Sequence, residues 1–145
     1  TGVQTCALPI YLGIGEGYSN SQASFSSVAI EISNMGPLKK SGDALIDIYG
    51  KEYCNLSEEA AYDAVDYRGY SYFASYTEEQ YTTLKRLLAD LTAKYQIKKT
   101  LLPAEMRFST VPGAALSGAA GIVSHVNFRK DKVDLAPNFD WSKVQ

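Results

Sequence analysis

The stretch GIVSHVNFRKDKVDLAPNFDW, residues 121–141, contains the only histidine of the chain, His125. It begins with an apolar run from Gly121 to Ser124 that follows a passage rich in Gly, Ala and Ser, a pattern typical of a short buried strand. We therefore expect this strand to deliver His125 to the mouth of a loop. The charges that alternate over residues 129–134, followed by a proline turn and two aromatic residues, predict a structured loop rather than a helix.

His125 and Asp134 are the candidate metal ligands of this stretch. Neutral imidazole and carboxylate both suit zinc, and a catalytic zinc site keeps three protein ligands and an open position for water. On residue types alone, a lone histidine with a nearby aspartate is more often a surface pair than a metal site. Both interpretations stay open at this level.

Residues 77–95 carry the clearest secondary-structure pattern. Thr77 and Gln80 have the spacing of a capping box, and Glu78 and Glu79 suit the first turn of a helix. The apolar residues recur at helical spacing and predict one buried face: Tyr81, Leu84, Leu87, Leu88, Leu91 and Tyr95.

The remaining segments are less regular. Residues 28–34, VAIEISN, alternate with period two and predict a strand that carries Glu31 on its solvated face. We expect residues 11–27 to form a flexible loop, residues 98–120 a long connection, and residues 38–76 the least regular part. A short strand near Ile46 and Ile48 and one or two helical turns after residue 57 are the regular pieces expected in that last region.

Aromatic residues crowd the end of this irregular region: Tyr62, Tyr67, Tyr70, Tyr72, Phe73 and Tyr76. Ring faces pack against the C–H surfaces of sugars while hydroxyls form hydrogen bonds, so the cluster suits glycan or peptide recognition. The same rings can equally well cover a core, and the pattern does not separate the two roles.

The order of residues in the C-terminal stretch resembles the signature of the type 2 N-acetylmuramoyl-L-alanine amidases, the zinc fold shared with peptidoglycan recognition proteins. That signature has a histidine, a variable loop, K-x-D-P-G-P and then F-x-W. His125, Lys132-x-Asp134 and Phe139-x-Trp141 match it. The chain departs from it at residues 135–136, Leu-Ala, where the family has Pro-Gly.

The resemblance implies that His125 and Asp134 are zinc ligands and that Lys132 helps to polarise the substrate carbonyl. A second match, Ala29-Ile30-Glu31 with Asn34-x-Gly36, implies that Glu31 is a general base or water-orienting carboxylate. We expect Glu31 to project toward His125 from a strand adjacent to the one that ends there. Contacts with substrate are assigned to the following residues: Asn34, Arg129, Tyr70 and Tyr72.

With this resemblance we expect an α/β fold, a mixed central β-sheet flanked by helices, incomplete at its N-terminus. A chain of 145 residues fits one domain. The net charge of -2 gives no electrostatic reason to expect nucleic acid, and no apolar run approaches the ~18 residues of a membrane span. We expect a monomer whose partner is peptidoglycan, and the two cysteines leave the compartment open.

Residues 1–10, TGVQTCALPI, read like a translated sequencing adapter, and we expect them to be non-native, with residues 11–145 forming an amidase domain fragment. The family takes its first zinc histidine from a segment upstream of the matching region, and His125 is already used. Cys6 has no recognisable ligand spacing. We therefore expect the chain as given to be inactive or nearly so.

The function implied is zinc-dependent hydrolysis of the amide bond between N-acetylmuramic acid and L-alanine, a step of cell-wall degradation. The main alternative is a non-catalytic peptidoglycan-binding module on the same fold, because the site rather than the fold decides activity. A more distant alternative is an unrelated α/β interaction domain, in which His125 and Asp134 would lie far apart.

Overall fold

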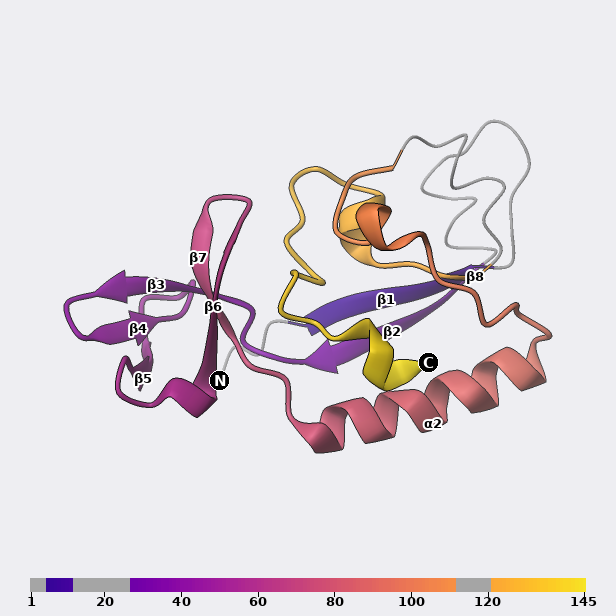
Figure 1. Cartoon of the computed structure of the whole chain (residues 1–145), viewed down its shortest axis with the longest axis horizontal. Helices are drawn as coiled ribbons and strands as arrows, with labels where there is room; N and C mark the ends of the chain where they lie inside the picture. The colour runs from indigo at the N-terminus through magenta and orange to yellow at the C-terminus, as the bar shows by residue number, and fades with distance from the viewer. Residues whose placement is uncertain (1–4, 12–26, 112–120) are drawn as a thin grey trace.

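The computed structural model describes residues 5–11, 27–111 and 121–145, which form two antiparallel sheets and one α-helix (Figure 1). The first sheet has three strands in the order β2-β1-β8. Its strands are β1 (Thr5–Tyr11), β2 (Ser27–Ser33) and β8 (Gly121–Ile122). β2 corresponds to the strand predicted from the alternation of Val28, Ile30 and Ile32, so that prediction is confirmed.

The second sheet has five strands in the order β5-β4-β3-β7-β6. Its strands are β3 (Pro37–Ser41), β4 (Ala44–Ile46), β5 (Glu52–Asn55), β6 (Tyr62–Tyr67) and β7 (Tyr70–Ala74). The expectation that residues 38–76 are the least regular part is therefore wrong. The strands are short, and glycines with positive φ at the connections allow the chain to reverse: Gly42 (60°), Gly50 (81°) and Gly69 (87°).

The mixed α/β content is as expected, but the described strands do not form a single mixed sheet flanked by helices. Their ladders are all antiparallel, and the parallel contact is an isolated bridge between Leu101 and Ile122. Antiparallel neighbours can be joined by tight turns, whereas parallel ones need long crossovers. The other helical pieces are short 3-10 turns: η1 (Glu59–Ala61), η2 (Ala104–Met106), η3 (His125–Asn127) and η4 (Trp141–Val144).

The α-helix, α2 (Glu78–Lys94), begins after Thr77, whose side chain forms the predicted capping box with Gln80. Its buried face carries Tyr81, Leu84, Leu88 and Thr92. The prediction is confirmed for the helix and most of its buried face, but Leu87 and Tyr95 are 39% and 44% exposed. Leu87 lies about 100° around the helix from its buried neighbour, and Tyr95 is the C-cap, beyond the last helical turn.

Two clusters of buried side chains hold these layers together. The larger joins the three-stranded sheet, α2 and the C-terminal residues, and includes Ile30, Leu88 and Trp141. Figure 1 shows η4 lying between this sheet and α2. The smaller cluster lies within the five-stranded sheet, where Leu45 and Cys54 are buried.

Strand β1 lies between β2 and β8, so Glu31 is not on a strand adjacent to the one that ends near His125. That part of the expectation is wrong, because the segment expected to be non-native supplies the intervening strand. The origin of residues 1–10 stays a prediction. The expectations for residues 12–26 and 112–120 lie outside the described residues. Among the described residues, α2 is neither long nor apolar enough to cross a bilayer, and no other helix is.

Two neighbouring leucines of α2 test this packing. Leu88 is fully buried whereas Leu87 is 39% exposed. Leu88→Ala should lower the free energy of unfolding by about 2–5 kcal/mol, because it removes buried methyl groups and leaves a cavity. Leu87→Ala should cost less than about 1 kcal/mol. Urea denaturation followed by the fluorescence of Trp141 measures both, and equal losses would contradict the assigned helix face.

Candidate functional site

The His125 and Asp134 side chains are in contact, and both residues lie in the segment that follows β8. His125 Nδ1 lies 3.1 Å from Asp134 Oδ2, and the two side chains are 28% and 17% exposed. The Val126 amide donates to the Asp134 carbonyl at 3.0 Å, so the main chain is closed at the same point. The structure thus brings together the two residues predicted as zinc ligands.

The turn that presents His125 is fixed by Asn127, which is 1% exposed. The Asn127 amide nitrogen donates to the carbonyls of Met106, Arg107 and Ser109 at 3.0, 3.2 and 2.8 Å. Its amide oxygen accepts the Ser124 N–H at 2.8 Å, which closes a capping box around η3. All these buried polar groups have partners, so the turn has little freedom to reorient His125.

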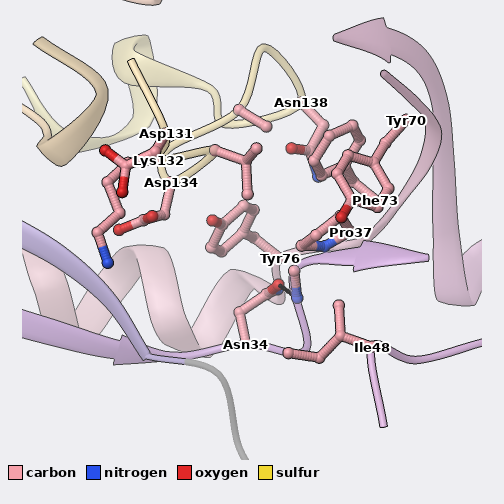
Figure 2. A pocket seen from close by; sticks show the side chains of 13 residues that line it. Asn34, Pro37, Ile48, Tyr70, Phe73, Tyr76, Asp131, Lys132, Asp134 and Asn138 are labelled. Atoms are coloured by element: carbon pink, nitrogen blue, oxygen red, sulfur yellow. Dashed lines mark hydrogen bonds between the residues drawn. The ribbon is translucent and has the colours of Figure 1, made fainter. Parts of the chain in front are cut away.

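A cavity of about 340 Å³ opens beside Asp134, between residues 131–138 and one end of the five-stranded sheet. Figure 2 shows Lys132 and Asp134 on the loop side and Tyr70 and Tyr76 on the sheet side. Its remaining wall includes Asn34, Pro37 and Asn138. The cavity therefore combines aromatic surface, side-chain amides and a few charged groups, a composition typical of small-molecule and peptide sites.

Of the residues predicted to contact substrate, Asn34 and Tyr70 line the cavity. Asn34, however, is 7% exposed and its amide is already engaged. The amide nitrogen donates to the carbonyls of Ala74 and Ser75 at 3.3 and 3.2 Å, and its oxygen accepts the Gly36 N–H at 2.7 Å. Asn34 thus joins the end of β2 to the end of β7, which is a structural role.

Arg129 and Tyr72 lie outside the residues that line this cavity. The Arg129 guanidinium binds Asp131 through two hydrogen bonds of 2.9 and 2.6 Å on the exposed side of the loop. These bonds hold the pKa of Asp131 below its usual value. Tyr72 packs edge-to-face on Tyr62, with ring centroids 5.7 Å apart, so its ring belongs to the packing of the five-stranded sheet.

Glu31 is exposed on β2, between Ile30 and Ile32, which are buried in the cluster that includes α2. Because side chains alternate along a strand, Glu31 points to the opposite face of the sheet. Figure 1 shows α2 on one side of the three-stranded sheet and the turn that follows β8 on the other. Glu31 thus points away from Ile30 and Ile32, and β1 separates its strand from β8, the strand that His125 follows.

Sequence patterns missed Arg68, in the turn between β6 and β7, and the contacts of Tyr67, the last residue of β6. The Tyr67 hydroxyl donates to the Phe108 carbonyl at 2.6 Å. Burial raises the pKa of this hydroxyl, the Arg68 cation opposes the rise, and the Asp134 carboxylate adds to it. Local sequence patterns give no signal for these contacts, because the contacts join segments far apart in the chain.

A catalytic zinc uses three protein ligands in a tetrahedral site. Two ligands held about 2.1 Å from one tetrahedral zinc lie about 3.4 Å apart, close to the separation of His125 Nδ1 and Asp134 Oδ2. Within residues 5–11, 27–111 and 121–145, no group of three His, Cys, Asp or Glu side chains is placed to hold a metal ion. The described residues thus fit two of the three ligands of a catalytic zinc.

Comparisons with protein-family models, with characterised proteins and with solved structures find no match to this chain. The description of the molecule therefore rests on its fold class and on the geometry of the candidate site. It is a mixed α/β chain with a His125–Asp134 pair and Lys132 beside a cavity.

The structural role of Asn34 gives a prediction. Asn34→Ala should lower the free energy of unfolding by about 1–3 kcal/mol, because it leaves the Gly36 N–H and the Ser75 carbonyl without their side-chain partner. Asn55→Ala should cost less, since the Asn55 bonds to Ser57 are exposed to water. Urea denaturation compares the two variants. Unchanged stability in Asn34→Ala with weaker ligand binding would instead favour the substrate-contact role.

Proposed function

We propose that this chain is a type 2 N-acetylmuramoyl-L-alanine amidase domain, which hydrolyses the amide bond between N-acetylmuramic acid and L-alanine in peptidoglycan. The observation that carries the proposal is the 3.1 Å approach of His125 Nδ1 to Asp134 Oδ2. Lys132, from the same loop as Asp134, lines the cavity beside this pair. A nitrogen donor and an oxygen donor in contact, with a lysine on the same loop, suit the hydrolysis of an amide.

When bound, zinc supplies a Lewis acid that polarises a carbonyl and activates water at neutral pH. The residues of the chain supply the rest. The Lys132 ammonium stabilises the negative charge that develops on the carbonyl oxygen as the amide is attacked. The Glu31 carboxylate takes a proton from the attacking water and passes it to the departing amine of L-alanine.

The cavity wall suits a muramoyl peptide. Its volume of about 340 Å³ lies in the range of ordinary ligand sites, about 300–1,000 Å³. Tyr70 and Tyr76 offer ring faces to apolar C–H groups of a sugar or peptide. Asn138 lines the same wall and supports its shape, because its amide nitrogen donates to Asp63 Oδ2 and to the Ala74 carbonyl, each at 3.1 Å.

The second candidate function is a non-catalytic peptidoglycan-binding module on the same fold. The observation that favours it is that the described residues bring two zinc donors together, whereas a catalytic zinc uses three. Binding through the tyrosine side chains of the cavity needs no metal. The two candidates therefore share a ligand and differ in whether a bond is cut.

One assay separates them. The chain is incubated with insoluble peptidoglycan and zinc, and two quantities are measured: the protein that sediments with the polymer and the new amino groups released on L-alanine. Zinc-dependent release that disappears in His125→Ala supports the amidase, and sedimentation without release, by this chain and by a chain extended with an upstream histidine-containing segment, supports the binding module. Neither sedimentation nor release would contradict both. The same assay on a chain extended by an upstream histidine-containing segment tests the expectation that a missing ligand limits activity.

The proposed general base gives a further prediction. In the active form, Glu31→Gln should lower turnover by about 10²–10⁴-fold, because the amide cannot accept the proton, while zinc affinity stays unchanged. Glu52→Gln is the matched control, since Glu52 is an exposed glutamate on β5. Turnover and zinc affinity are measured on the same preparations. Near-normal turnover in Glu31→Gln would remove Glu31 from the mechanism.

A further inference from the structure

Arg68 makes an unusual set of contacts for a residue at a hairpin turn. Its guanidinium reaches the loop that separates His125 from Asp134 and donates to main-chain carbonyls there. One terminal nitrogen donates to the carbonyls of Arg129 and Lys130, at 3.0 and 3.2 Å, and to that of Lys132. These bonds join Arg68 to residues 129–132, which lie about sixty positions away in the sequence.

The second terminal nitrogen of Arg68 binds the other side of the loop. It donates to Thr110 Oγ1 at 2.9 Å and, more weakly, to the Val126 carbonyl at 3.4 Å. Val126 directly follows His125, and Lys132 comes two residues before Asp134. One side chain thus holds the loop close to both candidate ligands.

The chemistry explains why an arginine occupies this position. Carbonyl oxygens that converge on one point repel each other, because each carries the negative end of a peptide dipole. A guanidinium offsets this repulsion with a delocalised positive charge and several N–H groups in a rigid planar fork. A lysine ammonium carries its three N–H donors on one nitrogen and cannot spread them as a guanidinium does. An apolar side chain would leave the carbonyls without a partner, which is costly for half-buried groups.

The backbone of Arg68 belongs to the tight turn of the β6–β7 hairpin. Tyr67 pairs with Tyr70, so Arg68 and Gly69 are the two residues of the turn, and their φ values are 47° and 87°. A two-residue hairpin turn of this kind needs a positive φ at both central positions. The turn thus sets the point from which the Arg68 side chain reaches the loop.

We propose that Arg68 is a positioning residue: it fixes residues 126–132 so that His125, Lys132 and Asp134 meet at the rim of the cavity. The expected effect of Arg68 on catalysis rests on the proposed amidase function. Arg68 does not touch the reacting atoms, and it acts through the main chain of the loop. The β6–β7 hairpin, whose Tyr70 lines the cavity, is thereby tied to the residues that perform the chemistry.

The first test needs neither metal nor substrate. The variants are Arg68→Ala, Arg68→Lys and, as the matched control, Arg86→Ala on the exposed face of α2. The Val126 amide donates to the Asp134 carbonyl, so its hydrogen exchange reports whether the loop stays closed. His125 is the only histidine, so its ring signals in NMR spectra are assigned without ambiguity.

In folded Arg68→Ala, exchange at Val126 should accelerate by about 10-fold or more while α2 amides stay unchanged, because only the loop opens. The His125 ring signals should shift. Arg68→Lys should give a smaller change in the same direction, and Arg86→Ala none. Wild-type exchange and unshifted His125 signals in folded Arg68→Ala would overturn the proposal. If Arg68→Ala does not fold, Arg68→Lys and Thr110→Val decide by the same criteria.

The second test separates positioning from general support of the fold. With peptidoglycan and zinc, in the chain extended by the upstream histidine-containing segment, Arg68→Ala should lower kcat by about 10–100-fold with KM nearly unchanged, because Lys132 is misplaced for the transition state. In a Lys132→Ala background the same change should cost less than about threefold more. A raised KM with unchanged kcat would overturn the positioning role. Absence of hydrolysis by the extended wild-type chain would count against the amidase proposal, and the exchange experiment would still decide whether Arg68 fixes the loop.

Discussion

The carbonyl oxygen of Ala74, at the end of β7, accepts hydrogen bonds from two asparagine side chains that come from different parts of the chain. Asn34 follows β2 and donates at 3.3 Å, and Asn138 lies in the C-terminal segment and donates at 3.1 Å. A carbonyl oxygen has two lone pairs, so one buried atom can satisfy both amides. The two sheets and residues 131–138 are therefore held in a fixed relation at this point, and the cavity beside Asp134 takes its shape from that junction.

The features that the sequence predicted best are those set by neighbours in the chain. The capping box of Thr77 and Gln80 and the alternation of Val28, Ile30 and Ile32 are local, and α2 and β2 begin and end close to where those patterns place them. The five-stranded sheet escaped prediction because its strands are short and its pairing depends on turns with positive φ, which composition indicates only as breaks. The sequence left its tyrosines open between recognition and packing, and in the structure Tyr62 and Tyr72 pack on each other while Tyr70 lines the cavity.

The residues of the candidate site also fall into those that a local pattern predicted and those that it did not. The meeting of His125 and Asp134 was expected from a short motif, and the structure places the two side chains together. Arg68 could not be found by such a pattern, because its partners are main-chain carbonyls and every residue type offers one. The assignment of Asn34 to substrate contact stays a prediction, and its burial and its bonds to Ala74 and Ser75 give it a structural role that the sequence did not indicate. Distance along the chain, more than residue chemistry, limited what sequence could reveal.

The buried thiol of Cys54 has a practical consequence for following how this molecule opens. Cys54 lies in the smaller cluster of the five-stranded sheet and is 6% exposed, and burial raises the pKa of its thiol. Because the thiolate is the reactive species, alkylating agents must wait until that sheet opens. Trp141 lies in the other cluster, between the three-stranded sheet and α2. Alkylation of Cys54 and emission of Trp141 thus report on separate layers, and a lag between them would show that the two layers come apart one after the other.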